Sequence, residues 1–186
     1  MDFTVDRYHA MIDSGVLGPD DRVELLLGKI VPMSPVGRFH AACVSTIHRL
    51  FFKTHGDRFT FREEKPITIP DRSEPEPDIT VAIFDPEAYV TGHPRPKDIH
   101  LVIEVSDRTL EKDQTLKLEI YARAGIAEYW IVNLVERQFL VYTQPDGAGN
   151  YGHRAVYEEG QAFAHELLGN IVTADYLPRL IPPVKQ

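Results

Sequence analysis

The chain has 186 residues, of which 43% are hydrophobic and 26% charged, and these fractions are ordinary for a globular protein. This length predicts one domain with a full hydrophobic core, spanning residues 1–186, rather than two domains. The net charge of −8 argues against a protein that coats nucleic acid non-specifically. It does not exclude an enzyme that acts on nucleic acid, because carboxylates that bind a divalent cation no longer repel phosphate once the metal is present.

Several features bear on the cellular compartment. The single cysteine, Cys43, excludes an intramolecular disulfide and fits a reducing environment. The stretch "MDFTVDRYHAMIDSG" carries acidic residues early and lacks the apolar centre of a signal peptide. No apolar run approaches the roughly 20 residues of a membrane span. We therefore expect a cytoplasmic protein that does not interact with a membrane.

The first third of the chain predicts two helices separated by a pair of short strands. Thr4 is placed to cap a helix over residues 5–15. Residues 22–33 predict two short strands about a turn at Gly28–Lys29. Apolar residues then recur with helical spacing over residues 36–56, which predicts the second helix.

The middle of the chain predicts the strands of a sheet. One or two strands are expected over residues 59–69, and single strands over 79–84 and 99–105. The last two runs are nearly continuous in β-formers, which is typical of central strands that are buried on both faces.

A helix and a hairpin are expected next. Residues 110–124 predict a helix that ends at Gly125, and residues 128–133 and 137–143 predict a hairpin. The expected fold class is α+β, a single domain in which helices flank a mixed sheet with a strand-helix-strand unit at its centre.

Glu104 is the most informative residue for function. It interrupts "LVIEV", an apolar strand in which a carboxylate is costly unless it has a partner, a proton or a metal. Asp78 begins a neighbouring strand, and adjacent strands lie about 4.8 Å apart, so the two carboxylates could share one cation. Mg²⁺ prefers oxygen ligands and keeps several waters, which suits a site of two or three acids. Crowding and burial also predict a raised pKa for Glu104.

Lys117 is the third element of this constellation. On the predicted helix it lies four residues after Asp113 and four before Tyr121, so the three share one face, which would pack over the strand of Glu104. Lys112 is turned away from that face, at about 100° per residue. An ammonium group beside a cation and a scissile phosphate positions water and offsets developing negative charge.

Each of these residues also has a plain structural interpretation. Glu104, near the end of its strand, could reach solvent. Asp78 after Pro77 is typical of a turn at a strand start. Lys117 and Asp113 could form an exposed ion pair worth about 0.3–0.5 kcal/mol. Glu24, a fourth acid among apolar neighbours in "RVELLLG", could simply face water. The ordered set of four, rather than any one member, favours a metal site.

Three blocks in this order carry a family resemblance: "EPDITV", "LVIEVSDRTL" and "KDQTLKLEIYARAGIAEYWIVN". They resemble the PD-(D/E)xK nuclease superfamily and, more narrowly, the Uma-type restriction endonucleases, formerly a domain of unknown function. The segment "VELLLGKIVPMSPVGRFH" resembles the N-terminal block of that family. The resemblance covers roughly residues 4 to 145. It implies a restriction-endonuclease-like core, a mixed sheet of about four or five strands flanked by helices.

Carried over residue by residue, the resemblance implies catalytic roles for Glu24, Asp78, Glu104 and Lys117, with Asp78 and Glu104 as the metal ligands. The sequence departs from the superfamily at Ser106, where a lysine is expected two residues after the glutamate. Lys117 on the following helix resembles a migrated replacement, and Lys112 is the alternative. The stretch "DQTLK" also departs from the family, which leaves the local DNA contacts open.

Three further residues are candidates for lining the cleft. Asp113 and Tyr121 share the predicted helix face of Lys117, and His40 follows the N-terminal block. His40 and His48 lie two helical turns apart, which is too far to chelate one ion.

The predicted function is a Mg²⁺-dependent endonuclease that hydrolyses DNA phosphodiester bonds, with Mn²⁺ able to substitute. A homodimer is expected because a duplex has two strands and because two-fold oligomers are common. Two alternatives stay open: a catalytically silent nucleic-acid-binding or regulatory module of the same fold, and a phosphodiesterase acting on small nucleotides. Salt would weaken duplex binding steeply and small-nucleotide binding far less.

Overall fold

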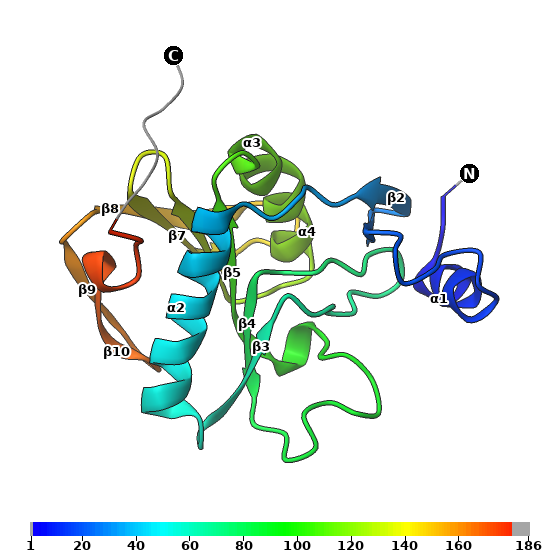
Figure 1. Ribbon diagram of the computed structural model, residues 1–186, viewed down its shortest axis with the longest axis horizontal. Coiled ribbons are helices and arrows are strands. Elements are labelled where there is room, and N and C mark those ends of the chain that lie inside the picture. The colour runs from blue at the N-terminus through cyan, green and yellow to red at the C-terminus, as the bar shows by residue number, and fades with distance from the viewer. Residues whose placement is uncertain (1, 180–186) are drawn as a thin grey trace.

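The computed structural model describes residues 2–179 and centres on a six-stranded mixed sheet (Figure 1). The strands lie in the order β3-β4-β5-β6-β7-β8, and within this sheet β5 and β6 form the parallel pair. Their bounds are β3 Phe59–Glu63, β4 Ile79–Ile83, β5 Ile99–Ser106, β6 Glu128–Asn133, β7 Gln138–Pro145 and β8 Tyr151–Glu158. The predicted α+β class and mixed sheet are confirmed, with six strands where the resemblance implied four or five.

Both faces of β5 are covered, which explains why this strand is nearly continuous in β-formers. Successive residues of a strand point to opposite faces. Ile103 packs in one core with helix α2 (Arg38–His55), whereas Val102 packs in a second core with helix α4 (Leu118–Arg123). Glu104 has the parity of Val102 and therefore points toward the helical segment that follows β5.

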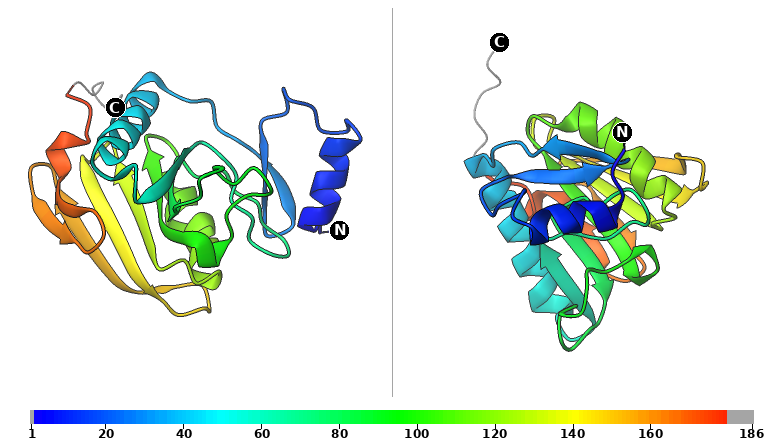
Figure 2. Two further views of the ribbon diagram at one scale, coloured as in Figure 1. Left: turned by 90° about the horizontal axis from the view of Figure 1, so that it is seen from below. Right: turned by 90° about the vertical axis from the view of Figure 1, so that its right-hand side faces the viewer.

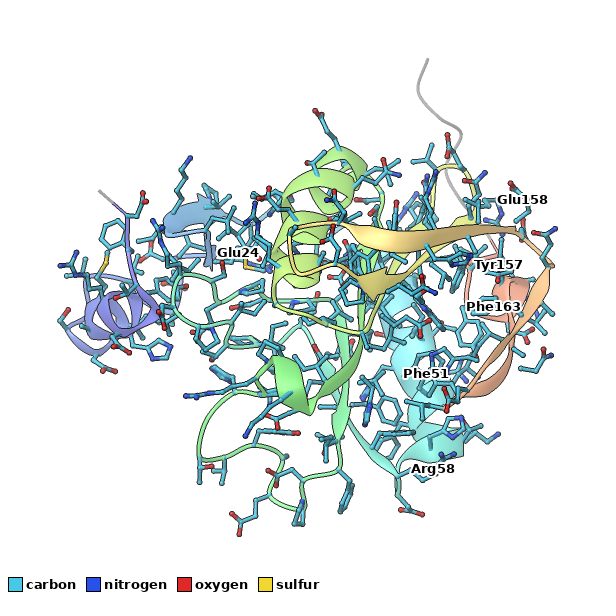
Figure 3. The ribbon with its side chains drawn as sticks, turned by 180° about the vertical axis from the view of Figure 1, so that it is seen from behind. Glu24, Phe51, Arg58, Tyr157, Glu158 and Phe163 are labelled. Carbon is cyan, nitrogen blue, oxygen red and sulfur yellow. The ribbon has the colours of Figure 1, made fainter. Side chains whose placement is uncertain are left out.

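A hairpin over residues 162–172 adds to the core on the face of the sheet that α2 covers. Strands β9 (Ala162–His165) and β10 (Gly169–Val172) pair antiparallel. The ring of Phe163 lies edge-on to Trp130, with 5.3 Å between centroids, and Tyr157 stacks on Phe163 at 4.2 Å. Figure 3 shows Tyr157 and Phe163 at the same end of the molecule as Phe51 of α2.

The N-terminal elements lie at the opposite end of the molecule from β8, β9 and β10 (Figure 2). They are helix α1 (Val5–Asp13) and a hairpin of β1 (Val23–Leu26) and β2 (Lys29–Pro32). Thr4 caps α1 as predicted, because its side chain accepts a hydrogen bond from the backbone N–H of Arg7.

The hairpin turn lies one residue earlier than predicted. Leu27 and Gly28 occupy it with φ of 48° and 80°, the positive values that a tight two-residue turn between antiparallel strands requires. Backbone hydrogen bonds between Leu25 and Glu74, in both directions, then tie β1 to the loop that precedes β4. This contact brings β1 toward the central sheet.

The helix predicted over residues 110–124 is not a uniform α-helix. It consists of α3 (Leu110–Lys112), a π turn (Asp113–Lys117) and α4. The backbone N–H of Leu118 donates to the carbonyl of Asp113, five residues back, which is the hydrogen bond that defines a π turn. Such turns are rare and frequently occur at functional sites. No helix within residues 2–179 is long and apolar enough to cross a membrane.

Candidate active site

The four residues expected to carry the chemistry line one pocket. They are Glu24 on β1, Asp78 just before β4, Glu104 on β5 and Lys117 at the end of the π turn. His40 and Asp113 line the same pocket. The pocket therefore lies where the N-terminal hairpin, the C-terminal end of β5 and the helical segment after β5 meet.

Asp78 is held beside Glu104 by the pairing of β4 with β5. Ile79 pairs with Ile103 in this antiparallel ladder, so the residue before Ile79 is next to the residue after Ile103. Oδ2 of Asp78 accepts a hydrogen bond from the backbone N–H of Val105 at 2.6 Å. This bond fixes the carboxylate at the wall of the pocket.

Glu104 is only 3% exposed, and one of its oxygens has two donors. Lys117 Nζ donates to Glu104 Oε1 at 2.8 Å, and the Tyr121 hydroxyl donates to the same oxygen at 2.7 Å. The prediction that Tyr121 lines the cleft is wrong. Its ring is fully buried against Tyr129, with 5.0 Å between centroids, and it supports Glu104 from within the core.

Burial and charge act in opposite directions on the pair of Glu104 and Lys117. Burial raises the pKa of Glu104 above its ordinary value, and the Lys117 ammonium limits that rise. The raised pKa expected for Glu104 is therefore confirmed. Burial would lower the pKa of Lys117, but the surrounding carboxylates, Glu104 first among them, outweigh burial and leave the pKa raised. Lys117 thus keeps its positive charge at 6% exposure.

Glu24 restrains both lysines of the pocket. It is 1% exposed; its Oε1 accepts a hydrogen bond from Lys112 Nζ at 2.5 Å, and its Oε2 lies 3.8 Å from Lys117 Nζ. Figure 3 labels Glu24 on the N-terminal hairpin, on the side of the hairpin toward the helical segment. The expectation that Lys112 turns away is wrong, because a π turn holds more residues than an α turn and brings residues five apart, such as Lys112 and Lys117, toward one side.

Ser106 stands where the superfamily has a lysine, and here it supports Asp113. The hydroxyls of Ser106 and Thr109 each donate to Asp113 Oδ2 at 2.6 Å. Burial raises the pKa of Asp113, which is 2% exposed, while Lys117 and the two hydroxyls oppose the rise. These bonds attach the first turn of the helical segment to the end of β5.

Three side chains of the pocket offer donor atoms that one cation could bind together. A ring nitrogen of His40 and carboxylate oxygens of Glu64 and Asp78 all lie within 4.8 Å of one another. His40 Nδ1 is buried and has no hydrogen-bond partner among residues 2–179. One nitrogen and two carboxylates are a donor set that fits a divalent cation. Glu104 does not belong to this group of three.

Glu64 is a pocket residue that sequence analysis missed. It directly follows β3 with φ of 48°, a left-handed conformation that costs a non-glycine residue about 1–2 kcal/mol. Its backbone N–H donates to the carbonyl of Asp78 at 3.0 Å, which holds the end of β3 beside the start of β4. The pair of acids Glu63–Glu64 at a strand end is the signal that could have identified it.

Charge is compensated unevenly across the pocket. The deeply buried Glu24 and Glu104 each pair with a lysine. Asp78 pairs with His40 instead, at 3.0 Å, and over the part of the chain described here neither Asp78 nor Glu64 forms a salt bridge with a lysine or arginine. Negative charge that no lysine or arginine pairs with directly therefore remains around Asp78 and Glu64.

Comparisons with known proteins agree with this architecture. A crystal structure from Anabaena variabilis, described as "a putative nuclease belonging to DUF820", matches with a TM-score of 0.66 at 17% identity, covering 94% of this chain and 97% of that chain. The two chains therefore share one fold. The chain also matches the sequence profile of Uma2, described as "putative restriction endonuclease", over residues 5–174. The chain belongs to the Uma2 family, as the resemblance implied. Comparison with curated proteins finds no match.

Proposed function

We propose that this protein is a metal-dependent endonuclease that hydrolyses phosphodiester bonds of DNA, with Mg²⁺ or Mn²⁺ as the cation. The observation that carries the proposal is the convergence of Asp78, Glu104 and Lys117 on one pocket. Two carboxylates from adjacent strands and a buried ammonium are the groups that a metal-assisted phosphodiester hydrolysis uses. Membership of a family described as "putative restriction endonuclease" supports a nucleic-acid substrate.

The acids of the pocket suit a divalent cation. Such an ion, when bound, acts as a Lewis acid toward a phosphoryl oxygen and favours ionisation of water. Asp78 and Glu104 would hold it through carboxylate oxygens. Glu104 offers Oε2 for this role, because its Oε1 already accepts hydrogen bonds from Lys117 and Tyr121.

The two lysines would bind the phosphate. Glu24 holds Lys112 directly and lies within 3.8 Å of Lys117, so neither ammonium is free to swing away. Positive charge that is fixed before the reaction stabilises the negative charge that develops on phosphate oxygens. These lysines also reduce the repulsion between an acidic pocket and the DNA backbone.

Cleavage of supercoiled plasmid DNA tests the proposal. The protein should nick or linearise the plasmid with Mg²⁺ or Mn²⁺ and leave it intact in EDTA. Lys117→Ala should slow cleavage by about 10²–10³-fold, the usual cost of losing one positioned donor. Lys53→Ala is the control, since Lys53 is exposed on α2 and does not line the pocket, and it should cleave like the unmodified protein.

Two outcomes would contradict the proposal in different ways. Undiminished cleavage by Lys117→Ala would remove Lys117 from the reaction and make Lys112 the lysine to test. Plasmid that stays intact with every cation, while a dinucleotide is hydrolysed, would favour the small-nucleotide phosphodiesterase.

We also propose that the protein acts as a homodimer. One pocket can attack one strand at a time, so cleavage of both strands of a duplex is simplest with two copies related by a two-fold axis. Sedimentation should then give a mass of twice 21.1 kDa. A mass of 21.1 kDa at working concentration, with and without DNA, would contradict the dimer.

A further inference from the structure

We propose that His40 and Glu64 join Asp78 as ligands of the cation in the pocket, and that the imidazole makes this site select a divalent transition-metal ion such as Mn²⁺ over Mg²⁺. The inference rests on the proposed function in that it takes the pocket to bind a divalent cation. It goes further by assigning His40 and Glu64 as ligands and by naming the class of ion.

The separations of the donor atoms are close to those of one coordination shell. His40 Nε2 and Asp78 Oδ2 are 3.0 Å apart. Two ligand atoms that lie at right angles, each about 2.1 Å from an ion, are also about 3.0 Å apart. The donor of Glu64 completes a set that lies within 4.8 Å. Ligands on opposite sides of such an ion would be about 4.2 Å apart, so all three can bind after small side-chain movements.

The distribution of charge favours this position over one centred on Glu104. Oε1 of Glu104 is already occupied by the ammonium of Lys117 and the hydroxyl of Tyr121. Asp78 and Glu64 have neither a lysine nor an arginine as a salt-bridge partner among the described residues. Two neighbouring carboxylates without a cation repel each other, and an ion bound between them replaces that repulsion with attraction.

The imidazole decides which ion is preferred. Mg²⁺ takes oxygen ligands in a strict octahedral arrangement and gives up its waters reluctantly. Imidazole nitrogen is a preferred ligand of first-row transition metals. Asp78 is the one described residue that holds the His40 ring by a hydrogen bond, and the other ring nitrogen is buried without a partner. A metal ion that binds this ring therefore displaces few contacts within the protein.

Electron paramagnetic resonance of Mn²⁺ tests the proposal on the full chain without DNA or turnover. Titration should show a bound Mn²⁺, and electron spin echo modulation should show coupling to an imidazole nitrogen. Mg²⁺ should displace the bound Mn²⁺ only when it is in about tenfold excess or more, a preference no smaller than the roughly tenfold loss of affinity that changes around a metal ligand already cause.

Three variants test which residues bind the ion. His40→Asn should abolish the nitrogen coupling and lower Mn²⁺ affinity by about 10–100-fold, with a much smaller effect on Mg²⁺. Glu64→Gln keeps the side-chain length and should weaken binding of both ions while the nitrogen coupling remains. His48→Asn is the matched control, because His48 lies on the same helix, pairs with Glu63 at 2.9 Å and does not line the pocket. Thermal melts without metal show that each variant is folded.

The outcomes that overturn this inference differ from those that overturn the nuclease. Absence of nitrogen coupling in the unmodified protein, or coupling that survives in His40→Asn, would remove His40 from the site. Equal affinity for Mn²⁺ and Mg²⁺ would overturn the selectivity. Either result leaves metal-dependent DNA cleavage intact, whereas nitrogen-coordinated Mn²⁺ in a protein that cleaves no DNA keeps the cation site and removes the proposed reaction.

Discussion

Lys117→Met tests how the ammonium group of Lys117 affects the protonation of the buried Glu104. Lys117 and Glu104 are 6% and 3% exposed, and their charged atoms are 2.8 Å apart. Methionine keeps the length of the side chain and removes the ammonium. Glu104 then retains the Tyr121 hydroxyl as its donor. A buried carboxylate without a cation takes up a proton rather than remain charged.

The magnitude follows from the pKa of Glu104. Burial already raises this pKa, and the variant lacks the ammonium that limits the rise, so Glu104 should be protonated in the folded variant at neutral pH. A glutamate in an unfolded chain has a pKa of about 4.3. At pH 7, about 2.7 units above this value, keeping Glu104 protonated lowers the free energy of unfolding of the variant by about 3.7 kcal/mol. At pH 5 the same term is about 1 kcal/mol. Above about pH 4.3 the folded variant binds more protons than the unfolded chain, so its free energy of unfolding falls as pH rises.

Urea unfolding of the variant and the unmodified protein between about pH 5 and pH 10 measures this slope. The unmodified protein shares this slope up to the raised pKa of its own Glu104, about 8, so above that pH the variant should lose up to about 1.4 kcal/mol per pH unit more than the unmodified protein. The double variant Glu104→Gln/Lys117→Met has no group to titrate and should recover most of the lost stability at pH 7, because replacing both members of a buried pair costs little. The reasoning fails if the deficit of Lys117→Met relative to the unmodified protein is the same at pH 5 and pH 10, or if the double variant is no more stable than the single one.

Two further predictions concern the cation and a turn. Adding Mn²⁺ or Mg²⁺ at a hundredfold excess over its Kd should stabilise the protein by about 2.7 kcal/mol, which is measured as a higher Tm. Asp78→Asn should lose most of this gain in Tm. An undiminished gain in Asp78→Asn would place the ion elsewhere. Gly28→Ala should destabilise the protein by about 1–3 kcal/mol more than Gly125→Ala in urea unfolding. Both glycines have positive φ, but a Cβ at Gly28 would lie 2.8 Å from Asp2 Cβ whereas at Gly125 it meets nothing within 4 Å. Equal losses would show that the close contact at Gly28 is relieved at no cost.

The elements that sequence patterns predicted correctly are those set by local interactions. Thr4 caps its helix through a bond to a residue three positions away, and a run of β-formers over residues 99–105 marks a strand covered on both faces. The catalytic candidates were found in the same way, because a glutamate inside such a strand needs a partner and a lysine on the next helix can supply one.

Tertiary structure decided the pitch of that helix and the make-up of the pocket. Local propensity in "DQTLK" does not call for a π turn, but Asp113 is bound by Ser106 and Thr109 through its side chain and by the Tyr129 hydroxyl through its carbonyl. The wider turn places Lys112 on the same side of the helical segment as Lys117, which no α-helical projection could predict. Glu64 enters the pocket through a left-handed backbone conformation that pairing with Asp78 sustains. Both features depend in part on hydrogen bonds between separate elements, from Tyr129 to Asp113 and from Glu64 to Asp78, and such bonds leave no periodic signal in the sequence.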